Sequence, residues 1–330
     1  MNERKLKQQM IEIGALLWAK DLASGFNGNL SARIDEQTIL LTGHGTCLGR
    51  LHEEDFIAID LEGRTQIQGK VSTENLLHRE IYKNFPKAKA VVHTHTTFTN
   101  GYFVSRDEFA PEVFEAKCQL GVIRAVFQAT PAVTDPVPVI ESFKTNNIVV
   151  LKNHGVVAMG ENHFDCFVLI QALEEAIKTH AVSQIYRTGD KGTVKPQTEQ
   201  KSSTNQKFKL FSPEQIEGIV KIVNADAQMK TLGEKTKMTM DLAVKLDETG
   251  EAYCFSFENG NIANVTKRED AEFLINAPAQ VWRSVFNREI DPFVATTQKK
   301  MTLRGDFAKI SKWYAPCSRI FELWTQVPIE

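Results

Sequence analysis

Apolar positions in the first half of the chain alternate between helical and extended spacing. Leu6, Met10, Ile13 and Leu17 recur every three to four residues and predict a helix near the N-terminus. Helical spacing over residues 74–85 and 164–186 predicts two further helices. Four short apolar runs predict strands: TILLT (38–42), FIAID (56–60), AVVHTHT (90–96) and IVVLKNHGVVAM (148–159). This half of the chain is therefore predicted to be a mixed α/β domain.

A second set of elements begins after residue 209. Ser212, followed by Pro and Glu, is typical of a helix start. Two strands follow, joined by the turn DETGE, because apolar residues alternate strictly at Met238, Met240, Leu242, Val244 and Leu246 and again at Tyr253, Phe255 and Phe257. A helix near residue 276, a strand at MTLRGD (301–306) and a final helix through 313–324 predict a smaller α/β unit.

The segment between the two patterns, RTGDKGTVKPQTEQKSSTNQKFK (187–209), is polar and nearly free of large apolar residues. Such a segment cannot bury enough apolar surface to offset the entropy lost on ordering. A chain of 330 residues also suits two domains better than one. We therefore predict a domain over 1–187, a linker over 188–208 and a second domain over 209–330.

Composition excludes several classes of partner. A formal charge of −2 creates no field that would attract nucleic acid, and no apolar window approaches the roughly 18 residues that span a membrane. The N-terminal helix is interrupted by Glu12 and Lys20, so we do not expect a signal peptide. Five widely spaced cysteines without a Cys-x-x-Cys motif suit reduced thiols, and together these features predict a cytoplasmic protein.

The stretch KAVVHTHTTF (89–98) places two histidines one residue apart in a predicted strand. Side chains alternate across a strand, so His93 and His95 would project from the same face. They could be buried core histidines, or they could bind one ion together. A third histidine, His154, follows another apolar run, and Gly155 beside it would leave room for close approach. Three neutral imidazoles with one open position are typical of a catalytic zinc centre.

A carboxylate that could move protons occurs in VSTENLLHREIY (71–82). If Ser72 or Thr73 caps the predicted helix, Glu74 lies in its first turn, at the positive end of the helix dipole. Glu74 would then either complement the dipole or act as an acid/base group.

Five segments, taken together, resemble the class II aldolase/adducin family, which includes fuculose-phosphate and ribulose-phosphate aldolases and epimerases. They are GFNGNLSAR (25–33), LTGHG (41–45), VSTENLLHREIY (71–82), VVHTHT (91–96) and LKNHGVVAMGEN (151–162), and the resemblance covers roughly residues 5 to 187. It implies an α/β/α domain with a central mixed or antiparallel sheet. It also implies that His93, His95 and His154 bind Zn²⁺ or another divalent cation, and that Glu74 is the catalytic acid/base. The adducin branch lacks these histidines, whereas this chain retains them.

The resemblance further implies an anion-binding pocket at Gly28, Asn29, His44, Gly45, Ser72 and Thr73. Helix starts and glycine-rich turns suit anions because their N–H groups are unpaired. The family usually has Thr-Pro-Ser/Thr-Gly where residues 42–45 here are Thr-Gly-His-Gly. His44 could be an anion ligand or a surface turn residue, and the substrate could be a carboxylate or an unphosphorylated compound.

Family members place the active site between subunits of a four-fold tetramer, with a tyrosine often contributed by the neighbouring subunit. Tyr102 is the nearest candidate for that tyrosine. The resemblance therefore predicts a homotetramer.

The second half resembles the sterol-carrier-protein family at GNI (260–262), IDPFVA (290–295) and KKMTLRGD (299–306), over about residues 210–326. That fold encloses an apolar tunnel, so the resemblance implies a lipid or another apolar ligand. The aromatic residues of this half could line such a tunnel or simply fill a core.

The resulting hypothesis is a zinc-dependent lyase of the class II aldolase type. It would cleave or form a C–C bond in a hydroxycarbonyl substrate, a sugar or a compound like a sugar phosphate, through a metal-stabilised enediolate. A dehydratase, decarboxylase or epimerase could use the same metal and Glu74, because fold and metal ligands do not separate these reactions. A non-catalytic lipid-binding or scaffold protein would instead hold a structural metal in a closed four-ligand shell.

Overall fold

The computed structural model describes residues 3–65, 71–189, 207–306, 309–310 and 312–330. The chain divides into two compact units, residues 1–192 and 193–330. Most of the predicted linker, residues 190–206, lies outside the described residues, so the linker stays a prediction. The helix that precedes it continues through Gly189, two residues past the predicted end of the first domain.

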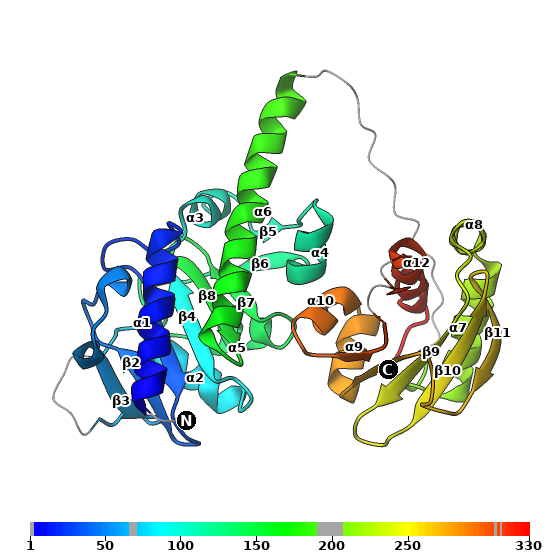
Figure 1. Cartoon of the computed structure of the whole chain (residues 1–330), viewed down its shortest axis with the longest axis horizontal. Helices are drawn as coiled ribbons and strands as arrows, with labels where there is room; N and C mark the ends of the chain where they lie inside the picture. Colours follow the sequence, from blue (N-terminus) through cyan, green and yellow to red (C-terminus); the bar gives the residue numbers. More distant parts are fainter. Residues whose placement is uncertain (1–2, 66–70, 190–206, 307–308, 311) are drawn as a thin grey trace. The chain divides into compact units, whose positions relative to one another are not determined.

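The first unit is built on an eight-stranded sheet (Figure 1). Its strands follow the order β3-β2-β1-β4-β8-β7-β6-β5. All neighbours pair antiparallel except β6 and β7, which are parallel. The strands are β1 Asn29–Arg33, β2 Thr38–Thr42, β3 Phe56–Asp60, β4 Ala90–Thr94, β5 Glu108–Phe109, β6 Ile123–Val126, β7 Ile148–Leu151 and β8 Gly155–Gly160. The predicted mixed, largely antiparallel sheet is confirmed.

Helices cover both faces of this sheet, which makes three layers. The helices are α1 Glu3–Ala19, α2 Asn75–Asn84, α3 Thr97–Phe103, α4 Phe114–Leu120, α5 Val137–Phe143 and α6 His163–Gly189, with 3-10 turns η1 Leu48–Arg50 and η2 Glu53–Asp55. Successive side chains of β4 point to opposite faces of the sheet and so pack into different cores. Val92 packs into the core formed with α1 and α6. Val91 packs into the opposite core, formed with α2 and α5. The predicted α/β/α domain is therefore confirmed.

The apolar run at residues 148–159 is not one strand, as its sequence suggests, but the hairpin β7–β8. Leu151 pairs with Gly155 across its turn, and Asn153 adopts a left-handed conformation with φ of +61°. Asparagine tolerates this conformation better than most residues, so Lys-Asn-His can reverse the chain here. His154 consequently lies in the turn, at the end of the sheet.

The second unit has a five-stranded sheet in the order β11-β10-β9-β12-β13, in which only β9 and β12 are parallel neighbours. Its elements are α7 Pro213–Ala225, α8 Ala227–Thr236, β9 Met240–Leu246, β10 Ala252–Glu258, β11 Asn261–Thr266, β12 Phe273–Ala277, α9 Ala279–Phe286, α10 Pro292–Thr297, β13 Thr302–Arg304 and α12 Tyr314–Trp324. Ser212 caps α7 as predicted, because its side chain accepts a hydrogen bond from the Gln215 N–H. Sequence patterns did not predict α8, whose cap is Asp226.

The interior of this unit is aromatic. The alternating apolar residues of the two predicted strands are all buried, and Phe255, Phe257, Trp282 and Trp324 are almost completely enclosed. Phe255 packs against Trp324 with ring centroids 5.0 Å apart. Across the described part of the chain, no helix has the length and apolar character that a membrane-spanning segment needs.

Candidate functional site

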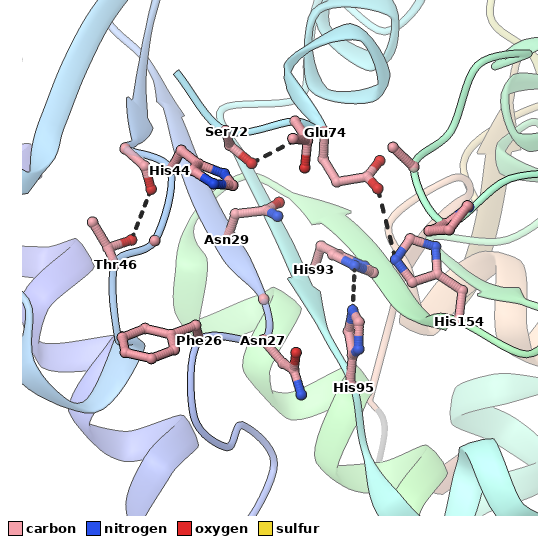
Figure 2. A pocket seen from close by; sticks show the side chains of 16 residues that line it. Phe26, Asn27, Asn29, His44, Thr46, Ser72, Glu74, His93, His95 and His154 are labelled. Atoms are coloured by element: carbon pink, nitrogen blue, oxygen red, sulfur yellow. Dashed lines mark hydrogen bonds and ion pairs between the residues drawn. The ribbon is translucent and has the colours of Figure 1, made fainter. Parts of the chain in front are cut away.

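The central strand of the first sheet carries the first of the three predicted metal ligands. His93 lies on β4, where it pairs with Asn29 of β1 and with Val157 of β8. His95 lies one residue beyond the end of β4, and His154 lies in the β7–β8 turn at the same end. The three rings converge (Figure 2), with ring centroids 4.8 to 4.9 Å apart. One ring nitrogen from each lies within 4.8 Å of the others.

A hydrogen bond decides which ring nitrogen of His93 carries the proton. Its Nδ1 lies 3.0 Å from the carbonyl oxygen of Val156. A carbonyl only accepts, so Nδ1 carries the proton and donates it, and neutral His93 keeps its lone pair on Nε2. That Nε2 faces Nε2 of His95 at 3.0 Å.

Burial keeps all three imidazoles neutral. It lowers the pKa of His93 well below the ordinary value, and the neighbouring His95 and His154 lower it further. Burial lowers the pKa of His95 to about 4 and also lowers that of His154. The neutral imidazole is the form that binds a metal ion.

These side chains fit a divalent cation. Nε2 of His93 and Nε2 of His95 face each other at 3.0 Å, and one ring nitrogen of His154 lies within 4.8 Å of both. A cation held by the three rings would use lone pairs that the described structure leaves facing one another. Nitrogen donors suit Zn²⁺ and also other transition metals.

Gly155 is needed for the rings to come this close. A Cβ at this position would lie 2.4 Å from the backbone oxygen of Thr94 and 2.9 Å from Cε1 of His93. The sequence-based expectation that Gly155 leaves room beside His154 is confirmed.

Glu74 lies beside the three histidines. The sequence predicted it in the first turn of α2, but it lies just before that turn. The helix begins at Asn75, so Glu74 is itself the N-cap residue, and its N–H donates to the Ser72 hydroxyl at 3.3 Å. This hydrogen bond holds residues 72–74 in a turn, so α2 starts one residue later than predicted.

The carboxylate of Glu74 is buried and points away from its own helix. It accepts a hydrogen bond from the N–H of Val133 at 3.2 Å, and its Oε1 lies 3.6 Å from Nε2 of His154. It makes no capping hydrogen bond to α2, so dipole complementarity alone does not explain its position. Burial raises the pKa of Glu74, against a smaller lowering by the Val133 N–H.

A cleft of about 510 Å³ contains these groups together with the predicted anion pocket. Gly28, Asn29, His44, Gly45, Ser72 and Thr73 all line it, as do Glu74 and the three histidines. Gly28 is required here, because its φ is +98° and a Cβ would lie 2.7 Å from the backbone oxygen of His93. The structure thus places every residue of the predicted pocket in one cavity.

Sequence reasoning missed five lining residues, Phe26, Asn27, Thr46, Pro131 and Ala132, whereas Gly43 belongs to the LTGHG turn that was expected to contribute. Pro131 and Ala132 precede Val133 in a segment with no recognisable motif, so no local signal marked them. Phe26 and Asn27 fall within a motif, but their side-chain types suggested no chemistry. Lysine and arginine are absent among the residues that line the cleft.

Comparison with known proteins accounts for this arrangement. The family model described as the class II aldolase and adducin N-terminal domain matches residues 8–181, just over half of the chain. The chain belongs to the class II aldolase/adducin family. The SCP-2 sterol transfer family model matches residues 221–316, so the second resemblance is confirmed as well.

Relatives of this class II aldolase family member carry more than one activity in their names. An L-fuculose phosphate aldolase from Methanococcus vannielii is 31% identical over 175 residues, 53% of this chain and 95% of the relative. A 3-oxo-tetronate 4-phosphate decarboxylase from Haemophilus influenzae is 28% identical and covers 54% of this chain and 88% of its own. The crystal structure of L-fuculose-1-phosphate aldolase from Thermus thermophilus has a TM-score of 0.53 at 25% identity, covering 58% of this chain and 100% of that one.

Tyr102, the predicted inter-subunit tyrosine of this family member, lies outside the cleft of its own chain. Its ring packs against Phe103, Phe109 and His180, and its hydroxyl donates to the backbone oxygen of Glu108 at 3.3 Å. It is not among the residues that line the cleft, so its role stays a prediction.

Glu174 of α6 supports the histidines from behind, and no sequence signal pointed to it. It is 1% exposed, and its carboxylate accepts hydrogen bonds from the N–H groups of Phe98 and Thr99, both at 2.9 Å. It also accepts from the Thr99 hydroxyl at 2.8 Å. Glu174 therefore holds the start of α3, the helix that follows His95.

The same helix reaches the third ligand. Nδ2 of Asn100, on α3, donates to the backbone oxygen of His154 at 3.1 Å. The position of α3 is thus coupled to both His95 and His154.

Replacing Glu174 should loosen α3 specifically. Glu174→Ala removes the acceptor of three hydrogen bonds, two of them buried, which should cost about 3 kcal/mol of local stability. Glu175→Ala is the matched control, because Glu175 is an exposed neighbour whose ion pair with Lys178 should contribute less than about 0.5 kcal/mol. Hydrogen exchange of residues 97–103 by mass spectrometry should accelerate only in Glu174→Ala. Equal exchange in the two variants would contradict this role.

Proposed function

We propose that the first unit is a divalent-metal-dependent lyase that cleaves or forms a C–C bond in a hydroxycarbonyl substrate. The observation that carries the proposal is the convergence of three neutral imidazoles with the Glu74 carboxylate 3.6 Å from His154, in one cleft. We propose Zn²⁺ as the ion, because three neutral nitrogen ligands with an open position are its usual catalytic set.

Each residue has a defined part in this proposal. His93, His95 and His154 hold the cation, which supplies Lewis-acid stabilisation of oxyanion charge on the substrate. Glu74 accepts and returns the proton. Its raised pKa brings the carboxyl group closer to neutral pH, which improves both steps. The Val133 N–H fixes one carboxylate oxygen and leaves the other facing the metal ligands.

A related reaction is the second candidate. Decarboxylation, dehydration and epimerisation also begin with an anion beside a carbonyl, and one relative is named as a decarboxylase. The C–C lyase reaction is preferred because two of the three proteins compared, from Methanococcus vannielii and Thermus thermophilus, are named as fuculose phosphate aldolases. A non-catalytic scaffold is less well supported, since the described residues provide three converging ligands rather than a closed set of four.

The anion pocket suggests the substrate class. We propose that it binds an anionic or strongly polar end of a sugar-like compound through neutral donors, since its lining contains Asn29, Ser72, Thr73 and His44 without lysine or arginine. We propose, from the family, that the chain works as a homotetramer and that Tyr102 completes a neighbour's cleft.

Metal content should depend on the three histidines and on the space beside them. Loaded wild-type protein should hold about one divalent ion per chain, and His93→Ala should lose it. Gly155→Ala should also lose it, because its Cβ would overlap Thr94 and His93. Gly101→Ala is the control, since a Cβ there meets nothing within 4 Å. Elemental analysis after gel filtration measures the ratio; wild type without stoichiometric metal would overturn the proposed centre.

Turnover should depend on Glu74. With a panel of hydroxycarbonyl compounds, phosphorylated and not, Glu74→Gln should reduce kcat by roughly 10² to 10⁴ while metal content is kept. Glu80→Gln, on the same helix and paired with Lys83 at 3.1 Å, should leave kcat unchanged. Because burial raises the pKa of Glu74, wild-type activity should fall with decreasing pH at a higher pH than an ordinary glutamate would give. Unchanged kcat in Glu74→Gln would sink the acid/base assignment.

For the second unit we propose binding of a lipid or another apolar ligand. The match to the sterol transfer family and the aromatic interior support this proposal. The alternative is that the aromatic residues only fill a core.

Tryptophan emission offers a direct test of this binding. Three of the four tryptophans, Trp282, Trp313 and Trp324, belong to the second unit, and Trp18→Phe removes the remaining one. Titrating that full-length variant with a fatty acid should shift the emission saturably, because a ligand would change the polarity around buried indoles. Native extraction followed by lipid mass spectrometry should recover a bound lipid. No shift together with an empty extract would favour the filled-core alternative.

A further inference from the structure

A second buried polar cluster lies behind the cleft and is not explained by metal binding. It joins Asn29 and Ser31 of β1 to His78 and Tyr82 of α2, and three of these four side chains are no more than 1% exposed. His78 lies between the two strand residues: Nε2 is 2.5 Å from Asn29 Oδ1, and Nδ1 is 2.6 Å from Ser31 Oγ. The Tyr82 hydroxyl lies 3.0 Å from Ser31 Oγ and 2.9 Å from Ser31 O.

Proton counting allows only two arrangements of this cluster. His78 is neutral, because complete burial lowers its pKa to about 3, so it carries one proton. In the first arrangement Ser31 donates to Nδ1, and Nε2–H donates to Asn29 Oδ1. In the second, Nδ1–H donates to Ser31, and the Asn29 amide is reversed so that its Nδ2 donates to Nε2. Tyr82 donates to the Ser31 carbonyl oxygen in either case, whereas the Ser31 hydroxyl can donate to Tyr82 only in the second arrangement, because in the first its one proton goes to Nδ1.

The geometry favours the first arrangement. A separation of 2.6 Å between Ser31 Oγ and Nδ1 is short for an N–H donor, whose usual distance is about 2.9 to 3.0 Å, and suits a hydroxyl donor better. The first arrangement also turns the Asn29 NH₂ group toward the cleft that contains the Glu74 carboxylate, which attracts N–H groups. The second arrangement would instead turn the Asn29 carbonyl oxygen toward the Glu74 carboxylate. Figure 2 shows the Asn29 side chain directed into the space below Ser72 and above His93.

We propose that His78 is a positioning residue, oriented by Ser31, that locks the Asn29 amide with its NH₂ group toward the cleft. The inference rests on the proposed function, and it specifies what this wall of the pocket recognises. A locked NH₂ donates to oxyanion or carbonyl oxygens and rejects ligand groups that can only donate. Asn29 Nδ2 has no hydrogen-bond partner among the described residues, so it is available to a ligand.

The lock explains why a buried, neutral histidine occupies α2 at this point. A free asparagine amide can rotate by half a turn and offer either donor or acceptor at little cost. Once Nε2–H is committed to Oδ1, that rotation would place two N–H groups face to face and leave Oδ1 in the cleft. A ligand without an acceptor at this point would bury the Asn29 N–H groups unpaired, and that cost makes the pocket specific for a ligand with an acceptor.

The nitrogen chemical shifts of His78 test the arrangement without any turnover. In ¹⁵N-histidine-labelled full-length protein, the His78 pair is identified by its loss in His78→Gln. The expected spectrum has protonated Nε2 and bare Nδ1. A protonated Nδ1 with bare Nε2 would overturn the proposal, because Asn29 would then present its carbonyl oxygen. This result is independent of whether the protein proves to be a lyase.

Two variants test the effect on ligand binding. Ser31→Ala removes the hydroxyl that donates to Nδ1 and holds the His78 ring, so the Nδ1 resonance should shift as it loses its hydrogen bond and KM should rise about tenfold, with kcat within about twofold. Tyr82→Phe is the matched control: it removes a buried hydroxyl from the same cluster but leaves Ser31 free to donate to Nδ1, so spectrum and KM should stay unchanged.

The outcomes separate the two levels of the proposal. An altered spectrum in Ser31→Ala without a change in KM would overturn the positioning role, and equal effects of both variants would show only a loss of packing. Should no substrate be turned over, binding of inorganic phosphate measured by ³¹P NMR replaces KM. Equal phosphate affinity in wild type and Ser31→Ala would then overturn the proposal.

Discussion

The antiparallel pairing of β4 with β1 on one side and β8 on the other is the constraint on which the site depends. This register places Asn29 beside His93 and brings the β7–β8 turn, with His154, to the same end of the sheet. One hydrogen bond across the ladder, from Nδ1 of His93 to the Val156 carbonyl, also sets the tautomer of the central ligand. A shift of one residue would turn His93 into the opposite core, where α1 and α6 pack.

Helices complete what the ladder begins, and they do so with buried polar side chains. The start of α2 brings Ser72 and Glu74 to the histidines, while His78, one turn further on, reaches Asn29. From the other face, Glu174 of α6 holds the start of α3 against the segment that follows His95. Buried polar groups are costly when unpaired, so each of these contacts favours one arrangement of strand and helix over others.

Burial has opposite effects on the two kinds of titratable group in the cleft. It lowers the pKa of the histidines and raises that of Glu74, which moves both toward their neutral forms. Neutral imidazoles can bind a cation, and a carboxyl group with a raised pKa can exchange protons near neutral pH. A single physical cause thus prepares both halves of the proposed chemistry.

The sequence by itself determined the two α/β units, most of the strands and the identity of the converging residues. Apolar periodicity reports burial directly, and the histidine and glycine motifs carry their chemistry in residue type and spacing. It did not determine that residues 148–159 form a hairpin, or that Glu74 precedes α2 as its N-cap residue, because a turn and a hydroxyl contact decide those boundaries. Only the tertiary structure brought Val133, Glu174 and His78 to the site. Their partners lie 47 to 76 residues away along the chain, and contacts at such separations leave no periodic signal in sequence.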